Sequence, residues 1–403
     1  MIARASLAYV VFYVALGATS PYMAPYLQSL GLSLGEIGIL GSLSAAVGLV
    51  CAPIWGSIAD RYPASRLLIP IAALMAVMGA LALVAIGRSI LIPVAVAGLA
   101  IGLTGTGPLL DAKALDLVHA DRDRFAHLRI WGSASFMVAA GLIGLIFVRR
   151  DSPAGFFYVY VPFLALTAIV ALGLGGRSAP SARAIGILRA PGRVLRNRSI
   201  ALFLAGALVA WTALVAQLSF FSIYLENLGA PPEQVGWAWS LGAVLEIPTM
   251  LFFPQLARRF GAGRLVVVGA LILAIRELSS VILTDPTLLI WLSTLQGLGY
   301  ALALVGGVTF VSRLAPPGTA ATAQGILSAV STGLAAIIGG TVGGLLAGWL
   351  TIRGMYVISA ATGFAAVGLI ALAVLPIAGR GKSAEPAGDS LAAELLVPGA
   401  TRK

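Results

Sequence analysis

Long apolar stretches alternate with short polar segments along most of the chain. Because the hydrocarbon core of a bilayer is about 30 Å thick, a helix needs about 20 apolar residues to cross it. Twelve stretches reach that length, and each predicts a membrane-spanning helix; they cover residues 6–28, 35–59, 67–87, 90–117, 127–148, 156–175, 200–225, 234–257, 264–283, 287–312, 320–349 and 354–376. The predicted fold class is therefore an all-α membrane protein with twelve transmembrane helices.

Lysines and arginines fall mostly in alternate connections between these stretches. Positive residues are enriched on the cytoplasmic side of a membrane protein. Of the 26, two lie within apolar stretches, twenty lie on one side, and four lie on the other, namely Arg88, Arg149, Arg150 and Arg353. We therefore expect an integral protein of the cytoplasmic (inner) membrane, with both termini in the cytoplasm.

The two halves of the chain are related by a repeat. A shift of 198 residues places 34–67 on 232–265, so that Gly38 meets Gly236 and Arg61 meets Arg259. Six plus six helices in parallel repeat is typical of alternating-access carriers, which bind their solute between the halves near the bilayer midplane. The sequence thus predicts two six-helix bundles, 1–175 and 200–376, joined by a basic cytoplasmic linker, 176–199. Residues 377–403 lack an apolar helical period and predict a disordered cytoplasmic tail.

Composition narrows the function classes. The chain is 59% hydrophobic and 10% charged, whereas soluble domains are about 25% charged. Its net charge of +11 follows from the membrane topology, so no nucleic-acid partner is expected. The only cysteine is Cys51 and the only histidines are His119 and His127, which leaves no cluster with metal-ligand spacing. No nucleophile–base pair and no G-x-x-x-x-G-K-[ST] motif occurs, so neither an enzyme nor a cofactor is expected.

Four charged residues lie within or beside the apolar stretches. Glu246 and Arg276 fall near the middle of theirs, whereas Asp111 and Arg129 flank the fourth and fifth. A charge in the bilayer costs roughly 2.5–3.5 kcal/mol even by insertion measurements, so such residues indicate binding or movement of something polar. Other readings stay open: a static Glu246–Arg276 pair, a solvated Asp111, and an Arg129 that reaches the interface. Glu277 points about 100° away from Arg276 on a helix and is left unassigned.

The connection after the second stretch carries the most specific motif. It reads Gly56-Ser-Ile-Ala-Asp60-Arg61-Tyr-Pro-Ala-Ser-Arg66, and this G-x-x-x-D-R-x-x-x-x-R pattern resembles the hallmark of the major facilitator superfamily. The resemblance covers residues 1 to about 376. It implies that Gly56, Asp60, Arg61 and Arg66 belong to a gate at the membrane surface. The second-half copy, 254–264, lacks the glycine and the aspartate.

Within that superfamily the chain is most similar to the phenylpropionate permeases, with lactose permease more distant. The similarity rests on residues 128–136, on residues 235–246 and on Arg276. It implies that Glu246 and Arg276 take part in proton coupling, that Arg129 binds substrate, and that Phe136 takes the place of a stacking aromatic, with Trp131 nearby. Gly299 and Leu302 occupy the places of the family's histidine and glutamate. Lactose is therefore not expected, and any proton coupling falls to Glu246 or Asp111.

Further polar and aromatic residues are expected to line the cavity. Tyr13 lies in the first stretch, and Gln217 shares a helical face with Phe221 and Tyr224 because their spacing is i, i+4, i+7. An interfacial aromatic belt is the other reading, and it fits Tyr13 and Gln217 poorly.

The sequence therefore predicts a secondary active transporter, monomeric and embedded in the lipid bilayer, that takes up a small-molecule substrate together with protons. An aromatic or other organic acid is preferred, because Arg129 and Arg276 offer cations. Proton-coupled sugar or nucleoside uptake is the first alternative. A drug or metabolite exporter and a non-transporting membrane sensor are the others.

Overall fold

The computed structural model describes residues 2–62, 65–118, 122–148, 152–175 and 190–380. The first half contains α1 (Ile2–Thr19), α2 (Met23–Ser29), α3 (Leu34–Arg61), α4 (Leu68–Ile86), α5 (Ile92–Leu117), α6 (Arg122–Ile146), the 3-10 helix η1 (Pro153–Phe156) and α7 (Phe157–Leu172). The second half contains α8 (Ala190–Leu195), α9 (Arg198–Asn227), α10 (Pro232–Val244), α11 (Glu246–Phe260), α12 (Ala262–Ile282), α13 (Pro286–Leu314), α14 (Ala320–Ser328), the π-helical turn η2 (Ala329–Leu334), α15 (Ala335–Leu350) and α16 (Ile352–Arg380).

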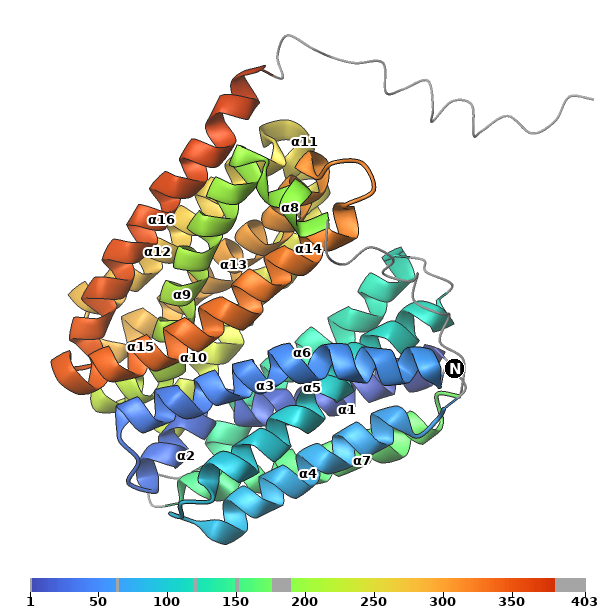
Figure 1. Ribbon diagram of the computed structural model, residues 1–403. Coiled ribbons are helices and arrows are strands. Elements are labelled where there is room, and N and C mark those ends of the chain that lie inside the picture. Colours follow the sequence, from blue (N-terminus) through green and yellow to red (C-terminus); the bar gives the residue numbers. More distant parts are fainter. Residues whose placement is uncertain (1, 63–64, 119–121, 149–151, 176–189, 381–403) are drawn as a thin grey trace, which may run out of the picture.

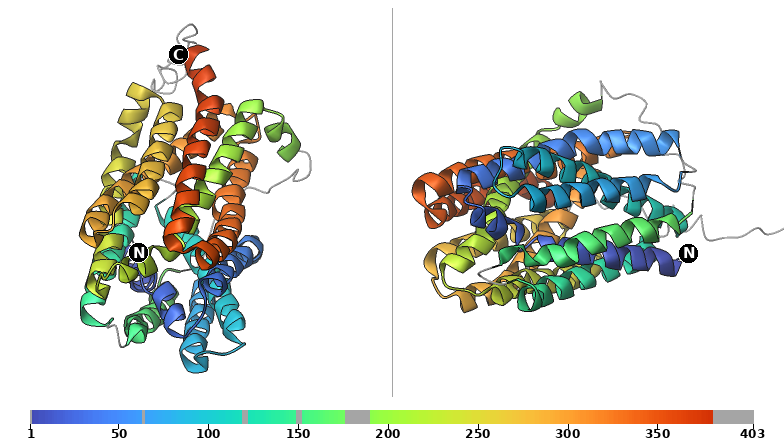
Figure 2. Two further views of the ribbon diagram at one scale, coloured as in Figure 1. Left: turned by 90° about the vertical axis from the view of Figure 1, so that its left-hand side faces the viewer. Right: turned by 90° about the horizontal axis from the view of Figure 1, so that it is seen from below.

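These helices form two bundles, α1–α7 and α9–α16, which meet along one end and diverge toward the other (Figure 1). Consecutive short helices combine into longer spans, so the described residues contain twelve helical segments long and apolar enough to cross a membrane. The right-hand view in Figure 2 shows the long helices running side by side from one face of the molecule to the other. The predicted all-α fold with twelve membrane helices is confirmed.

The internal repeat is visible in the helix boundaries. Helix α3 spans Leu34–Arg61, and α10 with α11 spans Pro232–Phe260, which is the offset that the sequence comparison gives. Helix α3 begins at a capping box: the Ser33 hydroxyl accepts from the Glu36 amide at 3.3 Å, and the Glu36 carboxylate accepts from the Ser33 amide at 2.7 Å. Such a cap satisfies two amides that a helix start leaves unpaired.

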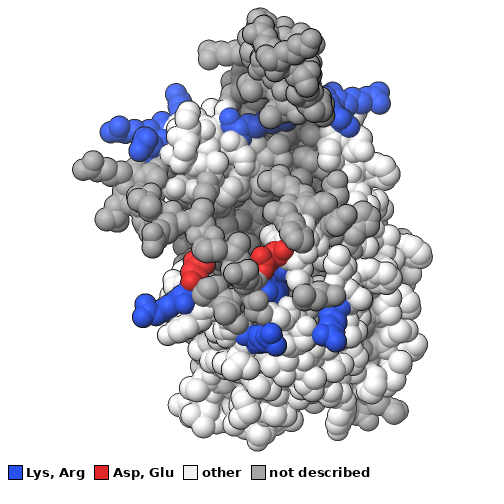
Figure 3. All heavy atoms as spheres, turned by 90° about the vertical axis from the view of Figure 1, so that its right-hand side faces the viewer, with Lys and Arg blue, Asp and Glu red and all other residues white. Residues whose placement is uncertain are grey.

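The face at which the bundles diverge, called the open side below, carries the N-terminus and α8 (Figure 1). Basic side chains gather on it (Figure 3), and the exposed ones include Arg61, Arg66, Arg193, Arg196, Arg258, Arg259, Arg264 and Arg313. The positive-residue pattern predicts that this side is cytoplasmic. Residues 377–380, assigned above to the tail, continue α16. The remainder of the tail and linker residues 176–189 lie outside the described residues.

At the opposite end, the closed side, glycines bring the two bundles into direct contact. Gly38 of α3 faces Gly340 and Gly344 of α15 so closely that a methyl group on Gly38 would overlap the Gly340 carbonyl oxygen. The Ser42 hydroxyl donates to the Ile337 carbonyl at 2.7 Å and accepts from Thr341 at 2.8 Å. Close backbone approach and interhelical hydrogen bonds are the main sources of helix association in lipid. These contacts therefore hold the closed side shut.

Replacing Gly38 with leucine is expected to open the closed side and to lower transport by roughly tenfold, because overpacking costs about 1–3 kcal/mol. The opening can be measured as faster alkylation of a Ser219→Cys probe in a Cys51→Ala background, since Ser219 lines a cavity at this end. Gly368→Leu on α16 is the matched control, because Gly368 is exposed, a methyl group on it meets nothing within 4 Å, and it lies outside the cavity that contains Ser219. Equal labelling of the Gly38 and Gly368 variants would contradict this account of closure.

Candidate substrate-binding cavity

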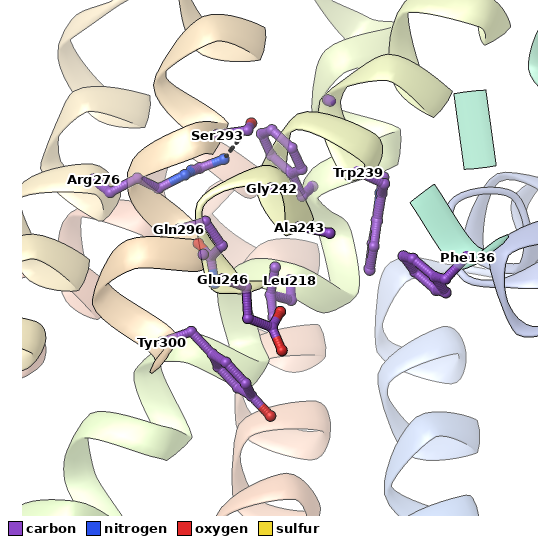
Figure 4. A pocket seen from close by; sticks show the side chains of 13 residues that line it. Phe136, Leu218, Trp239, Gly242, Ala243, Glu246, Arg276, Ser293, Gln296 and Tyr300 are labelled. Atoms are coloured by element: carbon purple, nitrogen blue, oxygen red, sulfur yellow. Dashed lines mark hydrogen bonds between the residues drawn. The ribbon is translucent and has the colours of Figure 1, made fainter. Parts of the chain in front are cut away.

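A cavity of about 200 Å³ lies in the second bundle, at its boundary with the first. Helices α9 to α13 supply nearly all of its lining, and α6 of the first bundle supplies Phe136 (Figure 4). The lining residues are Phe136, Leu218, Phe221, Ala238, Trp239, Gly242, Ala243, Glu246, Arg276, Ser293, Gln296, Gly297 and Tyr300. The walls are mainly apolar and aromatic with a few polar groups, which is the usual character of a small-molecule site.

Glu246 owes its position to a break in the membrane helix. Pro248 has no amide hydrogen, so it cannot donate to the carbonyl of Val244, and a proline inside a helix commonly breaks it one turn earlier. Helix α10 accordingly ends at Val244 and α11 begins at Glu246. Gly297 of α13 packs against this break so closely that a methyl group on it would overlap the Gly242 carbonyl oxygen. The break turns the Glu246 side chain into the cavity (Figure 4).

Arg276 is buried, with 1% of its surface exposed. Its guanidinium donates to the Ser280 hydroxyl at 2.8 Å and to the Ser293 hydroxyl at 3.5 Å. The guanidinium carbon also lies 4.3 Å from the centre of the Phe221 ring, as in a cation–π contact. Arg276 is thus held by its own bundle while it forms part of the cavity wall.

Aromatic side chains form the remaining walls. Trp239 is fixed by a hydrogen bond of 3.0 Å from its indole nitrogen to the Ser222 hydroxyl. Tyr300 packs edge-on against Trp211, with ring centres 5.3 Å apart. The Gln296 side-chain oxygen is buried and has no protein hydrogen-bond partner, so it is available to a hydroxyl or amine of a bound solute.

A second polar group lies in the first bundle. The Tyr9 hydroxyl donates to Asp111 at 2.6 Å, and the Arg129 guanidinium lies 3.7 Å from the other oxygen of the same carboxylate. Tyr13 stacks on Tyr9 with ring centres 6.0 Å apart. The structure therefore joins Asp111, Arg129 and Tyr13 in one cluster, in which Arg129 and Asp111 form an ion pair.

The two charged residues of the second bundle do not form an ion pair. The Glu246 carboxylate and the Arg276 guanidinium do not come within 4.0 Å of each other. Figure 4 shows the carboxylate directed toward Tyr300 and away from the guanidinium. A static Glu246–Arg276 pair is therefore absent from this conformation.

The other predicted site residues lie outside this cavity. Trp131 is 59% exposed, and Gln217 is fully buried with neither amide atom hydrogen-bonded. The gate motif lies where α3 ends on the open side, and Gly56, Asp60, Arg61 and Arg66 are all exposed there. Substrate contact by Trp131 and Gln217, and gating by the motif, remain predictions.

Two cavity residues, Trp239 and Tyr300, were not assigned from the sequence, although helical periodicity could have found them. Trp239, Gly242 and Glu246 are spaced i, i+3, i+7, and Ser293, Gln296 and Tyr300 are spaced in the same way, so each set shares one helical face. Projecting the face that carries Glu246 backward by two turns leads to Trp239.

Residues 2–358 match the protein-family model described as the MFS_1 like family. The chain belongs to this family of major facilitator transporters. Membership confirms the superfamily resemblance, and it makes the protein an integral membrane transporter of a small-molecule substrate and not an enzyme.

Relatives of this transporter differ in what they carry. It is 32% identical over 346 residues to a maltose permease of Geobacillus stearothermophilus, covering 84% of this chain and 86% of the permease. It is 26% identical over 301 residues to a probable 3-phenylpropionic acid transporter of Escherichia coli K12, covering 72% and 76%. Among solved structures, the nucleoside transporter NupG (D323A mutant) superposes with a TM-score of 0.82 at 16% identity, covering 92% and 99%. At that identity the last comparison supports the fold alone.

Proposed function

We propose that this transporter takes up a neutral, hydroxyl-bearing solute, a sugar or glycoside, together with a proton. The solute binds in the cavity around Glu246, and the two bundles rock about it so that the cavity opens to each side of the membrane in turn. The present structure is closed at the glycine contacts and open at the basic face. With the basic face in the cytoplasm, as the positive-residue pattern predicts, this is the inward-open state.

The main support for this substrate class is the distribution of charge around the cavity. Arg129 is paired with Asp111, and Arg276 is engaged by Ser280, Ser293 and Phe221. Glu246 has no ion pair within 4.0 Å among the described side chains, so the cavity presents an unpaired carboxylate, whereas the Arg276 guanidinium in its wall already donates to two hydroxyl groups.

That arrangement suits hydroxyl donors better than anions. Carboxylate and amide oxygens, here Glu246 and Gln296, accept hydrogen bonds from hydroxyl groups. The faces of Trp239, Phe136 and Tyr300 provide apolar area for the C–H side of a sugar ring. A negatively charged solute would be repelled by Glu246. The maltose permease relative supports the same substrate class.

A binding panel on purified protein tests this substrate class. Maltose, uridine and 3-phenylpropionate are compared by thermal shift, since a ligand that binds only the folded state raises its stability. We expect stabilisation by maltose or by another neutral sugar of the panel. Stabilisation by 3-phenylpropionate alone would contradict the proposal.

An aromatic carboxylate is the second candidate, because Arg276 and Phe221 lie together in the cavity wall. For this candidate, Arg129→Lys is expected to weaken 3-phenylpropionate binding by about tenfold or more, because lysine cannot make a bidentate pair with a carboxylate. Calorimetric titration measures the affinity. Equal affinity of this variant and wild type would remove Arg129 from the site and leave Arg276 as the cation on which an acid substrate depends.

Asp60 is proposed to act in the gate and not in binding. It is exposed at the end of α3, remote from the cavity lining. Asp60→Asn is expected to slow solute exchange in proteoliposomes while affinity changes by less than about fivefold, since exposed ion pairs contribute about 0–1 kcal/mol. A large loss of affinity with an unchanged exchange rate would place Asp60 in binding instead.

A further inference from the structure

The second bundle contains a carboxylate that the cavity does not use. Glu277, on α12, is 2% exposed, and its Oε2 atom has no hydrogen-bond partner among the residues that the structure describes. A methyl group at Gly363 of α16 would lie 2.7 Å from this oxygen. The Glu277 carboxylate therefore packs against the α16 backbone, where it fits only because residue 363 has no side chain. Glu277 is therefore buried between two helices and does not face lipid.

The groups that surround Glu277 offer little compensation for a negative charge. On its own helix Arg276 precedes it directly, yet no atoms of these two described side chains form an ion pair within 4.0 Å. The Tyr356 hydroxyl of α16 donates to the Gln217 carbonyl, and the Tyr224 hydroxyl of α9 donates to the Ser280 carbonyl.

A charged carboxylate without a partner is costly in surroundings of low dielectric constant. In the present conformation the neutral, protonated form of Glu277 is the one that fits. The cost would fall if a cation moved next to it, since an opposite charge nearby favours the ionised form.

Arg276 is the cation placed to make that change. Its guanidinium now points to the cavity, and its Nε atom is buried without a hydrogen-bond partner. The bond of 3.5 Å to Ser293 is long, so the bond of 2.8 Å to Ser280 is the main hydrogen bond that a movement of the guanidinium would have to break. A turn of the Arg276 side chain away from the cavity would bring its charge toward Glu277.

We propose that Glu277 is a second proton-binding site, coupled to the cavity through Arg276. When Arg276 faces the cavity, Glu277 holds a proton; when Arg276 turns back, the Glu277 O–H bond breaks, the proton passes to water, and the carboxylate pairs with the guanidinium. Because a solute or Glu246 can hold Arg276 on the cavity side, proton occupancy at Glu277 depends on cavity occupancy. The inference deepens the proposed function and rests on its proton coupling.

Infrared spectroscopy of the purified full-length protein tests this site with pH as the only probe. A protonated carboxyl in dry surroundings gives a C=O stretching band apart from the amide bands. We expect wild type to show such a band at neutral pH, Glu277→Gln to lose it, and Glu246→Gln to retain it. In Arg276→Gln the band should persist to more alkaline pH, because the cation that favours ionisation is missing.

Two further variants cover the case in which Glu277→Gln does not fold. Gly363→Ala keeps the carboxyl but brings a methyl group against Oε2, and Glu277→Asp shortens the side chain, so each should shift the position of the band. Absence of the band in wild type, or a band unmoved by every change at positions 277 and 363, would overturn the proposal. The infrared experiment uses no solute. Its result therefore does not depend on whether the protein transports sugar.

Discussion

Glu246→Gln is expected to abolish pH-driven accumulation of solute while exchange of solute across the membrane continues. The glutamine keeps an acceptor oxygen in the cavity but can neither bind nor release the transported proton. Uphill movement driven by a pH gradient should therefore fall to background. The measurement is uptake of labelled solute into proteoliposomes, with and without an imposed pH gradient, beside counterflow without one.

Glu233→Gln is the matched control, because Glu233 lies in the first turn of α10, away from the cavity lining. It should accumulate solute as wild type does. Uphill accumulation by Glu246→Gln at the wild-type level would contradict the proposal that Glu246 binds the transported proton.

The second large effect is expected for Trp239→Ala, which should weaken solute binding by about 30-fold. Removing a central aromatic contact typically costs about 2 kcal/mol or more in binding. The loss should appear in the dissociation constant measured by titration calorimetry with the sugar that stabilises the protein most.

Trp291→Ala provides the comparison, since Trp291 is 63% exposed on α13 and outside the cavity. Its affinity should match wild type. Equal effects of the two alanine variants would mean that Trp239 acts on stability and not on binding.

Helix positions in this transporter follow from local properties of the sequence. Each membrane span is a run of apolar residues whose required length is set by the bilayer, so boundaries such as Leu34–Arg61 agree closely with the predicted 35–59. The repeat offset fixed the correspondence of α3 with α10 and α11 for the same reason. Capping residues such as Ser33 refine a boundary without changing the fold.

Side-chain partnerships were less predictable, because they depend on rotamers and on the conformation of the two bundles. Asp111 and Arg129 were both singled out, yet their contact forms only after α5 and α6 pack. Glu246 and Arg276 share a cavity, as adjacent helices suggest. After the break before Pro248, however, the Glu246 carboxylate points toward Tyr300 and not toward Arg276. Trp131 is predicted from its place beside Arg129 in a motif, whereas the structure places Trp239 in the cavity wall and leaves Trp131 59% exposed.

Charge at the cavity supports a different substrate class from the one that the sequence favours. Counting arginines near the apolar stretches favoured an anionic solute, since a sequence does not show which cations are already engaged. In the structure Arg129 pairs with Asp111, and Arg276 donates hydrogen bonds to serine hydroxyls. The unpaired Glu246 then favours a neutral solute with hydroxyl groups.

The central claim, proton-coupled uptake of a neutral sugar, is tested most directly by transport of labelled maltose into proteoliposomes that contain the purified protein. With the interior alkaline, the account predicts accumulation above the external concentration, loss of that accumulation on adding a protonophore, and no competition from 3-phenylpropionate. Accumulation of 3-phenylpropionate in place of every neutral sugar tried, or sugar uptake indifferent to the pH gradient, would contradict it.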